Sequence, residues 1–185
     1  MQENIFDQFS KLIAIQSADK ALLLVENALK TQPDNVDFIG LKGVALFHLQ
    51  DLTCMQWLDK AVTLEPKNPY RYSSRAYVKD ALGDTKAAIE DYTIAIELDP
   101  LDEVAHNNLG LLEEKMGHKT KSLQYFKTAD DLAGVSQNPN YSFPTKHSNV
   151  LKKPKTKWKT IIEIFSSSKG WMEFFTFVKG RLKKI

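Results

Sequence analysis

Small apolar residues recur along the first 136 residues at intervals of 33 or 34 positions. The clearest column consists of Ala28, Ala61, Ala95 and Ala129. A second column, seven residues earlier, consists of Ala21, Cys54, Ala88 and Ser122. Between them lies a column of larger residues: Val25, Leu58, Tyr92 and Phe126. Self-similarity at a fixed period is typical of repeat proteins. The pattern predicts a domain over 1–136 with four repeats: 2–35, 36–68, 69–102 and 103–136.

Each repeat is predicted to form two helices joined by a short turn. Ala88, Tyr92 and Ala95 lie at helical spacing on one face. Gly83 can adopt the positive φ that ends a preceding helix. Pro100 stops the second helix, because proline disfavours helical geometry in the residue before it. The second repeat is one residue shorter than the third, and we expect this deletion in the turn over 49–53. One helix pair cannot bury its apolar face alone, so the pairs are expected to stack.

The stretch Ala88–Pro100, with Asn108, Leu109 and Gly110 in the next repeat, resembles the tetratricopeptide-repeat (TPR) family. The resemblance covers about three quarters of the chain. It implies an all-α fold, a right-handed α-solenoid of four helix-turn-helix repeats. It also implies a scaffold or adaptor that binds other polypeptides and is not an enzyme.

In the TPR family the first helix of each repeat lines a concave groove that receives peptides or helices. Transferred residue by residue, the groove would be lined in the first two repeats by Phe6, Ser10, Ile13, Asp37, Gly40, Val44 and Phe47. In the last two repeats it would be lined by Tyr70, Ser73, Tyr77, Asp80, Val104, Asn107, Leu111 and Glu114. Each set steps by three or four residues and so shares one helical face. This mixed apolar and acidic surface predicts a ligand with apolar anchors and basic flanks. For any single position, packing between repeats is the alternative explanation.

Charge divides the chain in two. Residues 1–136 carry 14 Lys and Arg against 21 Asp and Glu, a net charge of −7, whereas residues 137–185 carry 11 against 2, a net charge of +9. Residues 137–156 contain Pro, Asn and Ser and are predicted to be a linker. Residues 157–185 are predicted to form a basic amphipathic helical tail, because aromatic and aliphatic residues recur there at helical spacing. The apolar residues predicted to anchor the tail are Trp158, Ile162, Phe165, Trp171, Phe174, Phe175 and Val178.

Something is expected to cover the apolar face of the tail. Burying one such side chain contributes about 1.5–3 kcal/mol, so leaving several exposed is unfavourable. The tail could cap the last repeat or fold into the groove, it could lie on an anionic membrane surface, or it could bind a partner protein. Docking on the protein itself is our leading hypothesis, and peripheral membrane attachment is the main alternative. Nucleic acid is an unlikely partner, because no base-reading motif accompanies the lysine-rich run.

The sequence carries no signature of catalysis, of a metal site or of a cofactor. Cys54 is the only cysteine, so no internal disulfide can form, and it is expected to be buried. The four histidines lack metal-ligand spacing. Glu113 and Glu114 are interpreted as solvated residues. The first residues lack the features of a secretory signal, and no stretch has the apolar length of a membrane span, so a cytoplasmic location is expected.

Overall fold

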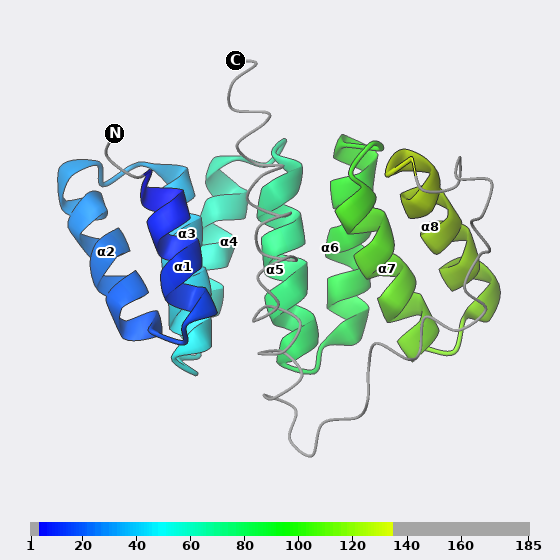
Figure 1. Ribbon diagram of the computed structural model, residues 1–185, viewed down its shortest axis with the longest axis horizontal. Coiled ribbons are helices and arrows are strands. Elements are labelled where there is room, and N and C mark those ends of the chain that lie inside the picture. The colour runs from blue at the N-terminus through cyan, green and yellow to red at the C-terminus, as the bar shows by residue number, and fades with distance from the viewer. Residues whose placement is uncertain (1–3, 135–185) are drawn as a thin grey trace. The chain divides into compact units, whose positions relative to one another are not determined.

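The computed structural model describes residues 4–134, and all regular structure in that range is α-helical (Figure 1). The eight helices are α1 (Ile5–Ala14), α2 (Ala18–Thr31), α3 (Val36–His48), α4 (Cys54–Leu64), α5 (Pro69–Ala81), α6 (Thr85–Leu98), α7 (Glu103–Lys115) and α8 (Lys119–Leu132). Among described residues, those up to Leu64 form one compact unit (unit 1) and those from Glu65 form another (unit 2). Within each unit, consecutive helices pack against one another. The predicted all-α class of helix-turn-helix repeats is therefore confirmed for the described residues.

Asparagine or aspartate precedes the first helix of every repeat. The side-chain oxygens of Asn4, Asn35, Asn68 and Asp102 accept hydrogen bonds from backbone N–H groups two or three residues later, at 3.3, 3.2, 3.1 and 2.9 Å. Such caps satisfy N–H groups that have no partner within the helix and typically contribute about 1 kcal/mol each. These caps fix where each first helix begins.

The turn between the two helices of each repeat contains one residue with positive φ. This residue is Gly83 (φ 99°) in the third repeat and Gly117 (φ 84°) in the fourth, as expected for glycine. In the first two repeats the equivalent residues are Gln16 (φ 57°) and Gln50 (φ 61°). The missing residue of the second repeat lies between Gln50 and Cys54, because Cys54 follows Gln50 by four residues. In the third and fourth repeats the equivalent residues, Ala88 and Ser122, follow the glycine of positive φ by five. The missing position falls within the expected range of 49–53.

Replacing Gln50 with glycine is expected to raise the free energy of unfolding by about 0.5–1 kcal/mol. A left-handed conformation costs a residue with a side chain about 1–2 kcal/mol, and glycine avoids this cost. Glycine also gives the unfolded chain more conformational freedom, which offsets part of the gain. Gly83→Ala is the matched control and should lower stability by about 1 kcal/mol. Urea denaturation followed by circular dichroism measures both. A loss of stability in Gln50→Gly would contradict the argument.

The periodic columns form the core of both units. Every residue of the three columns is buried except Ala28, which is half-buried. Cys54 is buried as expected. In unit 2 a core cluster brings together residues of α5, α6 and α7: Ala76, Ala88, Tyr92, Ala105, Leu109 and Leu112. The side-chain amide of Asn108 donates a hydrogen bond of 3.2 Å to the Tyr92 hydroxyl within this region.

Small residues of the first helices make room for large residues of the second helices. A β-carbon added to Gly43 would lie 2.8 Å from Leu58 Cγ, and one added to Gly110 would lie 2.7 Å from Phe126 Cδ1. Real β-carbons do not approach other atoms so closely, so both glycines permit close contact between the helices of a pair. In the first repeat the sizes are reversed, with Phe9 and the smaller Val25 both fully buried.

Candidate functional site

The first-helix face of unit 2 consists of the predicted groove residues of α5 and α7. On α5 these are Tyr70, Ser73, Tyr77 and Asp80, and on α7 they are Val104, Asn107, Leu111 and Glu114. All are half-buried except Ser73, which is buried. The face therefore presents two tyrosines, two aliphatic side chains, an amide and two carboxylates with part of their surface exposed. Burial also raises the pKa of the Tyr77 phenol well above its usual value, so this side chain is neutral at physiological pH.

An ion pair joins the ends of α5 and α7 on this face. Lys115 Nζ lies 2.5 Å from Asp80 Oδ1, and the Thr85 hydroxyl donates a hydrogen bond of 2.6 Å to the same oxygen. Sequence analysis did not identify Lys115 as part of the face. Its ammonium compensates one of the predicted acidic charges, leaving Glu114 as the other carboxylate of this face. The contact also shows that equivalent ends of the two first helices are neighbours.

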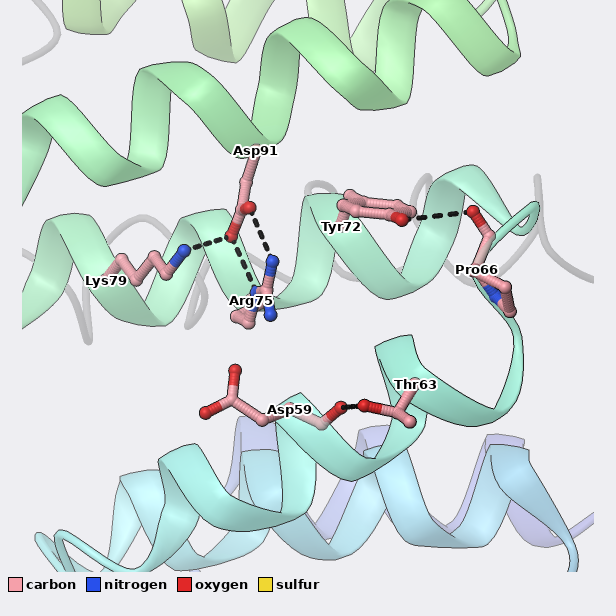
Figure 2. A network of polar contacts seen from close by, with 7 residues as sticks. All are labelled: Asp59, Thr63, Pro66, Tyr72, Arg75, Lys79 and Asp91. Atoms are coloured by element: carbon pink, nitrogen blue, oxygen red, sulfur yellow. Dashed lines mark hydrogen bonds and ion pairs between the residues drawn. The ribbon is translucent and has the colours of Figure 1, made fainter.

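A buried carboxylate on α6 is held by two cations from α5 (Figure 2). Asp91 is 2% exposed. Arg75 donates two hydrogen bonds of 2.8 Å to its two carboxylate oxygens, and Lys79 Nζ lies 2.8 Å from Oδ2. At the start of α5, the Tyr72 hydroxyl donates a hydrogen bond of 3.0 Å to the Pro66 carbonyl. The paired charges lock α5 onto α6 and so fix the helix that carries Tyr70 and Tyr77.

The first-helix face of unit 1 is less exposed. It consists of Phe6, Ser10, Ile13, Asp37, Gly40, Val44 and Phe47. Ile13, Gly40, Val44 and Phe47 are buried, whereas Phe6, Ser10 and Asp37 are half-buried. The Phe6 ring lies 6.5 Å from that of Phe38, which links α1 to α3. The sequence placed these residues on one helical face, but it did not predict how little of this face is open to solvent.

His48, at the end of α3, is expected to make the protein acid-sensitive. Burial lowers the pKa of its imidazole from 6.5 to about 4. The unfolded chain therefore binds more protons than the folded chain between these two values, and stability falls as the pH drops through this window. From pH 7 to pH 5 the loss should be about 2 kcal/mol.

The variant His48→Gln provides the comparison, because it cannot titrate. The wild type should lose about 2 kcal/mol more than the variant between pH 7 and pH 5, measured by urea denaturation at each pH. Parallel pH profiles for the two proteins would contradict this assignment.

The interpretation of Glu113 as a solvated residue is wrong. Its side chain is buried, with 5% of the residue exposed, whereas Glu114 is half-buried. His118 Nδ1 lies 2.5 Å from Glu113 Oε2, and Lys121 Nζ lies 3.9 Å from Glu113 Oε1. Glu113 lies three residues after Gly110, on the side of α7 that packs against α8. Partners in the following turn and helix therefore make a buried position acceptable for a carboxylate.

Within residues 4–134, no group of three or more His, Cys, Asp or Glu side chains could hold a metal ion. No helix in the same range has the length and apolar character to span a membrane. The predicted linker over 137–156 and tail over 157–185 lie outside the described residues. The tail residues Trp158, Ile162, Phe165, Trp171, Phe174, Phe175 and Val178 therefore stay predictions, as do the domain boundaries and the cytoplasmic location.

Antiparallel helix pairs of about 34 residues, with small residues at close helix contacts, define a helical-repeat protein. A sequence profile of the tetratricopeptide repeat matches residues 71–100 and 104–134. The chain therefore contains tetratricopeptide repeats. The matched segments are the two repeats of unit 2, where the columns of residues are most regular.

Known proteins of the same family match parts of the chain. Tetratricopeptide repeat protein 16 of Macaca fascicularis is 36% identical over 100 residues, which is 51% of this chain and 12% of that protein. Tetratricopeptide repeat protein 6 of Homo sapiens is 32% identical over 82 residues, which is 44% of this chain and 15% of that protein. The chain thus spans only a small part of the length of these relatives.

Solved structures share the fold. A crystal structure of MamA matches 100% of this chain and 98% of that chain, with a TM-score of 0.57 and 17% identity. The fragment of MamA from Desulfovibrio magneticus RS-1 that begins at residue 41 matches 72% of this chain and 76% of that chain. Its TM-score is 0.60 and its identity is 20%. At these identities the similarity shows the fold alone.

Proposed function

We propose that this protein is an interaction scaffold whose first-helix face in unit 2 binds another polypeptide. The observation that carries the proposal is the row of half-buried Tyr70, Tyr77, Val104 and Leu111 on two neighbouring first helices. Half-buried aromatic and aliphatic side chains on rigid elements supply apolar anchors at a small entropic cost. The family whose repeats the chain contains consists largely of protein-interaction scaffolds, which supports the same function.

The polar residues of the face define the kind of ligand. Asn107 offers both a donor and an acceptor, as a peptide backbone requires. Glu114 supplies a carboxylate, whereas the carboxylate of Asp80 is already paired with Lys115. The proposed ligand is a peptide or helix with two apolar anchors and a basic residue opposite Glu114.

Peptide selection followed by affinity measurement tests the proposal. Peptides selected from a displayed random library on the full-length protein would be synthesised, and their affinities measured by fluorescence anisotropy. The Tyr77→Ala, Leu111→Ala variant should bind about tenfold more weakly or worse. The matched control is the Leu98→Ala, Leu123→Ala variant, which removes exposed side chains from second helices and should bind as the wild type does. Equal loss in both variants, or no loss in the first, would reject this face as the binding site.

Membrane attachment by the tail is the competing proposal, motivated by its Trp, Phe and Lys residues. In this alternative the repeats display a partner at the membrane surface. Co-sedimentation of the full-length protein with phosphatidylserine-containing vesicles tests it, with phosphatidylcholine vesicles as the control. Binding that depends on phosphatidylserine and on Trp171 and Phe174 would favour attachment, and no binding would exclude it.

A further inference from the structure

The ion pair between Lys115 and Asp80 lies on the first-helix face of unit 2 and is open to solvent. The Lys115 side chain is 52% exposed and that of Asp80 is 27% exposed. Both side-chain hydrogen bonds that Asp80 accepts within residues 4–134, from Lys115 and from the Thr85 hydroxyl, go to Oδ1. The second carboxylate oxygen, Oδ2, accepts no hydrogen bond in that range. Asp80 therefore has the capacity to accept a further cationic group from outside the protein.

The ion pairs of Asp91 provide a comparison within the same unit. The Asp91 side chain is 3% exposed, and the side chains of Arg75 and Lys79 are 17% and 20% exposed. These two cations are held by a buried carboxylate and have a structural role. A pair as exposed as that of Lys115 with Asp80 contributes little to stability, because water solvates both charges and the long lysine side chain loses conformational freedom. Lys115 can therefore leave Asp80 at a small cost.

An aromatic ring lies next to Asp80 on the same side of α5. Tyr77 precedes Asp80 by three residues, so their side chains share one helical face, and Tyr77 is half-buried. Burial is the main cause of the raised pKa of the Tyr77 phenol, and the neighbouring Tyr92 and then Asp80 contribute to it. The Asp80 carboxylate is thus close enough to Tyr77 to act on it. A carboxylate beside an aromatic ring attracts a lysine or arginine side chain, through the ion pair and through the face of the ring.

We infer that Asp80 and Tyr77 form a recognition site for a lysine or arginine side chain of the bound polypeptide, and that Lys115 occupies this site until the ligand displaces it. Lys115 is then a specificity-determining residue, because a ligand replaces it only when other contacts hold the ligand's cation at Asp80. Leu111, four residues before Lys115 on α7, is the apolar anchor that supplies such a contact. The inference rests on the proposed function, and it adds a second acidic contact to the one with Glu114.

A double-mutant cycle on the full-length protein tests the exchange. The probes are the selected peptides that depend on Tyr77 and Leu111, with affinities measured by fluorescence anisotropy. Lys115→Met should bind them about threefold more tightly than the wild type, because no internal cation competes for Asp80. Asp80→Asn, which keeps an acceptor oxygen for Thr85, should bind them about fivefold more weakly. In the Asp80→Asn background, Lys115→Met should have no effect, because the carboxylate for which the two cations compete is gone. An equal gain in both backgrounds would overturn the proposal.

Lys119→Met is the matched control for the loss of one positive charge. Lys119 is an exposed lysine at the start of α8, a second helix that does not belong to the first-helix face. Its replacement changes the net charge as Lys115→Met does, but it leaves the cation on Asp80 in place. The control variant should bind the peptides as the wild type does. An equal gain in Lys119→Met and Lys115→Met would make net charge the cause and would overturn the proposal.

Substitutions in the peptide identify the cation that Asp80 recognises. Each lysine and arginine of a selected peptide is replaced in turn with methionine, and the affinity is measured for the wild type and for Asp80→Asn. One replacement should weaken binding to the wild type about fivefold and leave binding to Asp80→Asn unchanged. Peptides that depend on Tyr77 and Leu111 but contain no such residue would overturn this inference alone. Peptides that do not depend on Tyr77 and Leu111 would reject the proposed function as well, so the two failures are distinguishable.

Discussion

Replacing Arg75 with methionine is expected to lower the free energy of unfolding by about 3–5 kcal/mol. The substitution removes two hydrogen bonds of 2.8 Å from Asp91 and leaves that buried carboxylate with Lys79 alone. A buried charge that loses its main partner carries an uncompensated desolvation cost. Methionine keeps most of the aliphatic packing of arginine, so the loss reports mainly on the charge. Urea denaturation at pH 7 measures the difference.

Two further variants identify the cause of the loss. Arg75→Lys keeps the positive charge but not the two-pronged geometry, so it should lose less than Arg75→Met. The double variant Arg75→Met, Asp91→Leu removes both charges and should be more stable than Arg75→Met alone. If Asp91→Leu instead worsened the Arg75→Met variant, the carboxylate would not be the source of the cost. The proposed binding face depends on the ion pair between Arg75 and Asp91, because Arg75 lies on α5, the helix that carries Tyr70 and Tyr77.

The sequence predicted the repeat period, the turns and nearly all of the core, because these depend on local spacing along each helix. It did not predict the ion pair of Arg75 with Asp91, because that contact depends on how two helices of a pair are rotated against each other. The rotation of α7 against α8 likewise buries Glu113, which the sequence had led us to interpret as a solvated residue. The caps at Asn4, Asn35, Asn68 and Asp102 were a signal that the sequence did contain and that we did not use.

The sequence predicted which residues share the first-helix face, but not how much of each residue is exposed to solvent. Helical spacing placed Val44, Tyr77 and Leu111 on equivalent faces, and the structure has them on first helices as expected. The buried state of Val44 and Phe47 could have been anticipated from α3, where every position except Asp37, Lys42 and His48 is apolar or glycine. The partial exposure of Tyr77 could not have been anticipated from the sequence, because it depends on how the neighbouring helices pack. Pairing of Asp80 with Lys115 spans 35 residues and likewise requires the tertiary structure.

Replacing Phe126 with alanine is expected to lower the free energy of unfolding by about 3–5 kcal/mol. The Phe126 ring is 2% exposed and fills the space that Gly110 leaves between α7 and α8. Removing the ring loses apolar burial and leaves a cavity that the surrounding helices fill only in part. Thermal and urea denaturation of the full-length variant measure the loss.

The contact between Gly110 and Phe126 predicts that Gly110→Ala destabilises the wild type but stabilises the Phe126→Ala variant. In the wild type the new β-carbon would lie 2.7 Å from the Phe126 ring, so overpacking should outweigh the gain of about 1 kcal/mol in helix propensity. In the Phe126→Ala background the ring is absent, so Gly110→Ala should stabilise the protein by about 1 kcal/mol. Gly117→Ala is the matched control: its φ of 84° is unfavourable for alanine and its surroundings are open, so its cost should be equal in both backgrounds. If Gly110→Ala had the same effect in both backgrounds, contact with Phe126 would not be the reason for glycine at this position. The interlocking of small and large residues within each helix pair would then need another explanation.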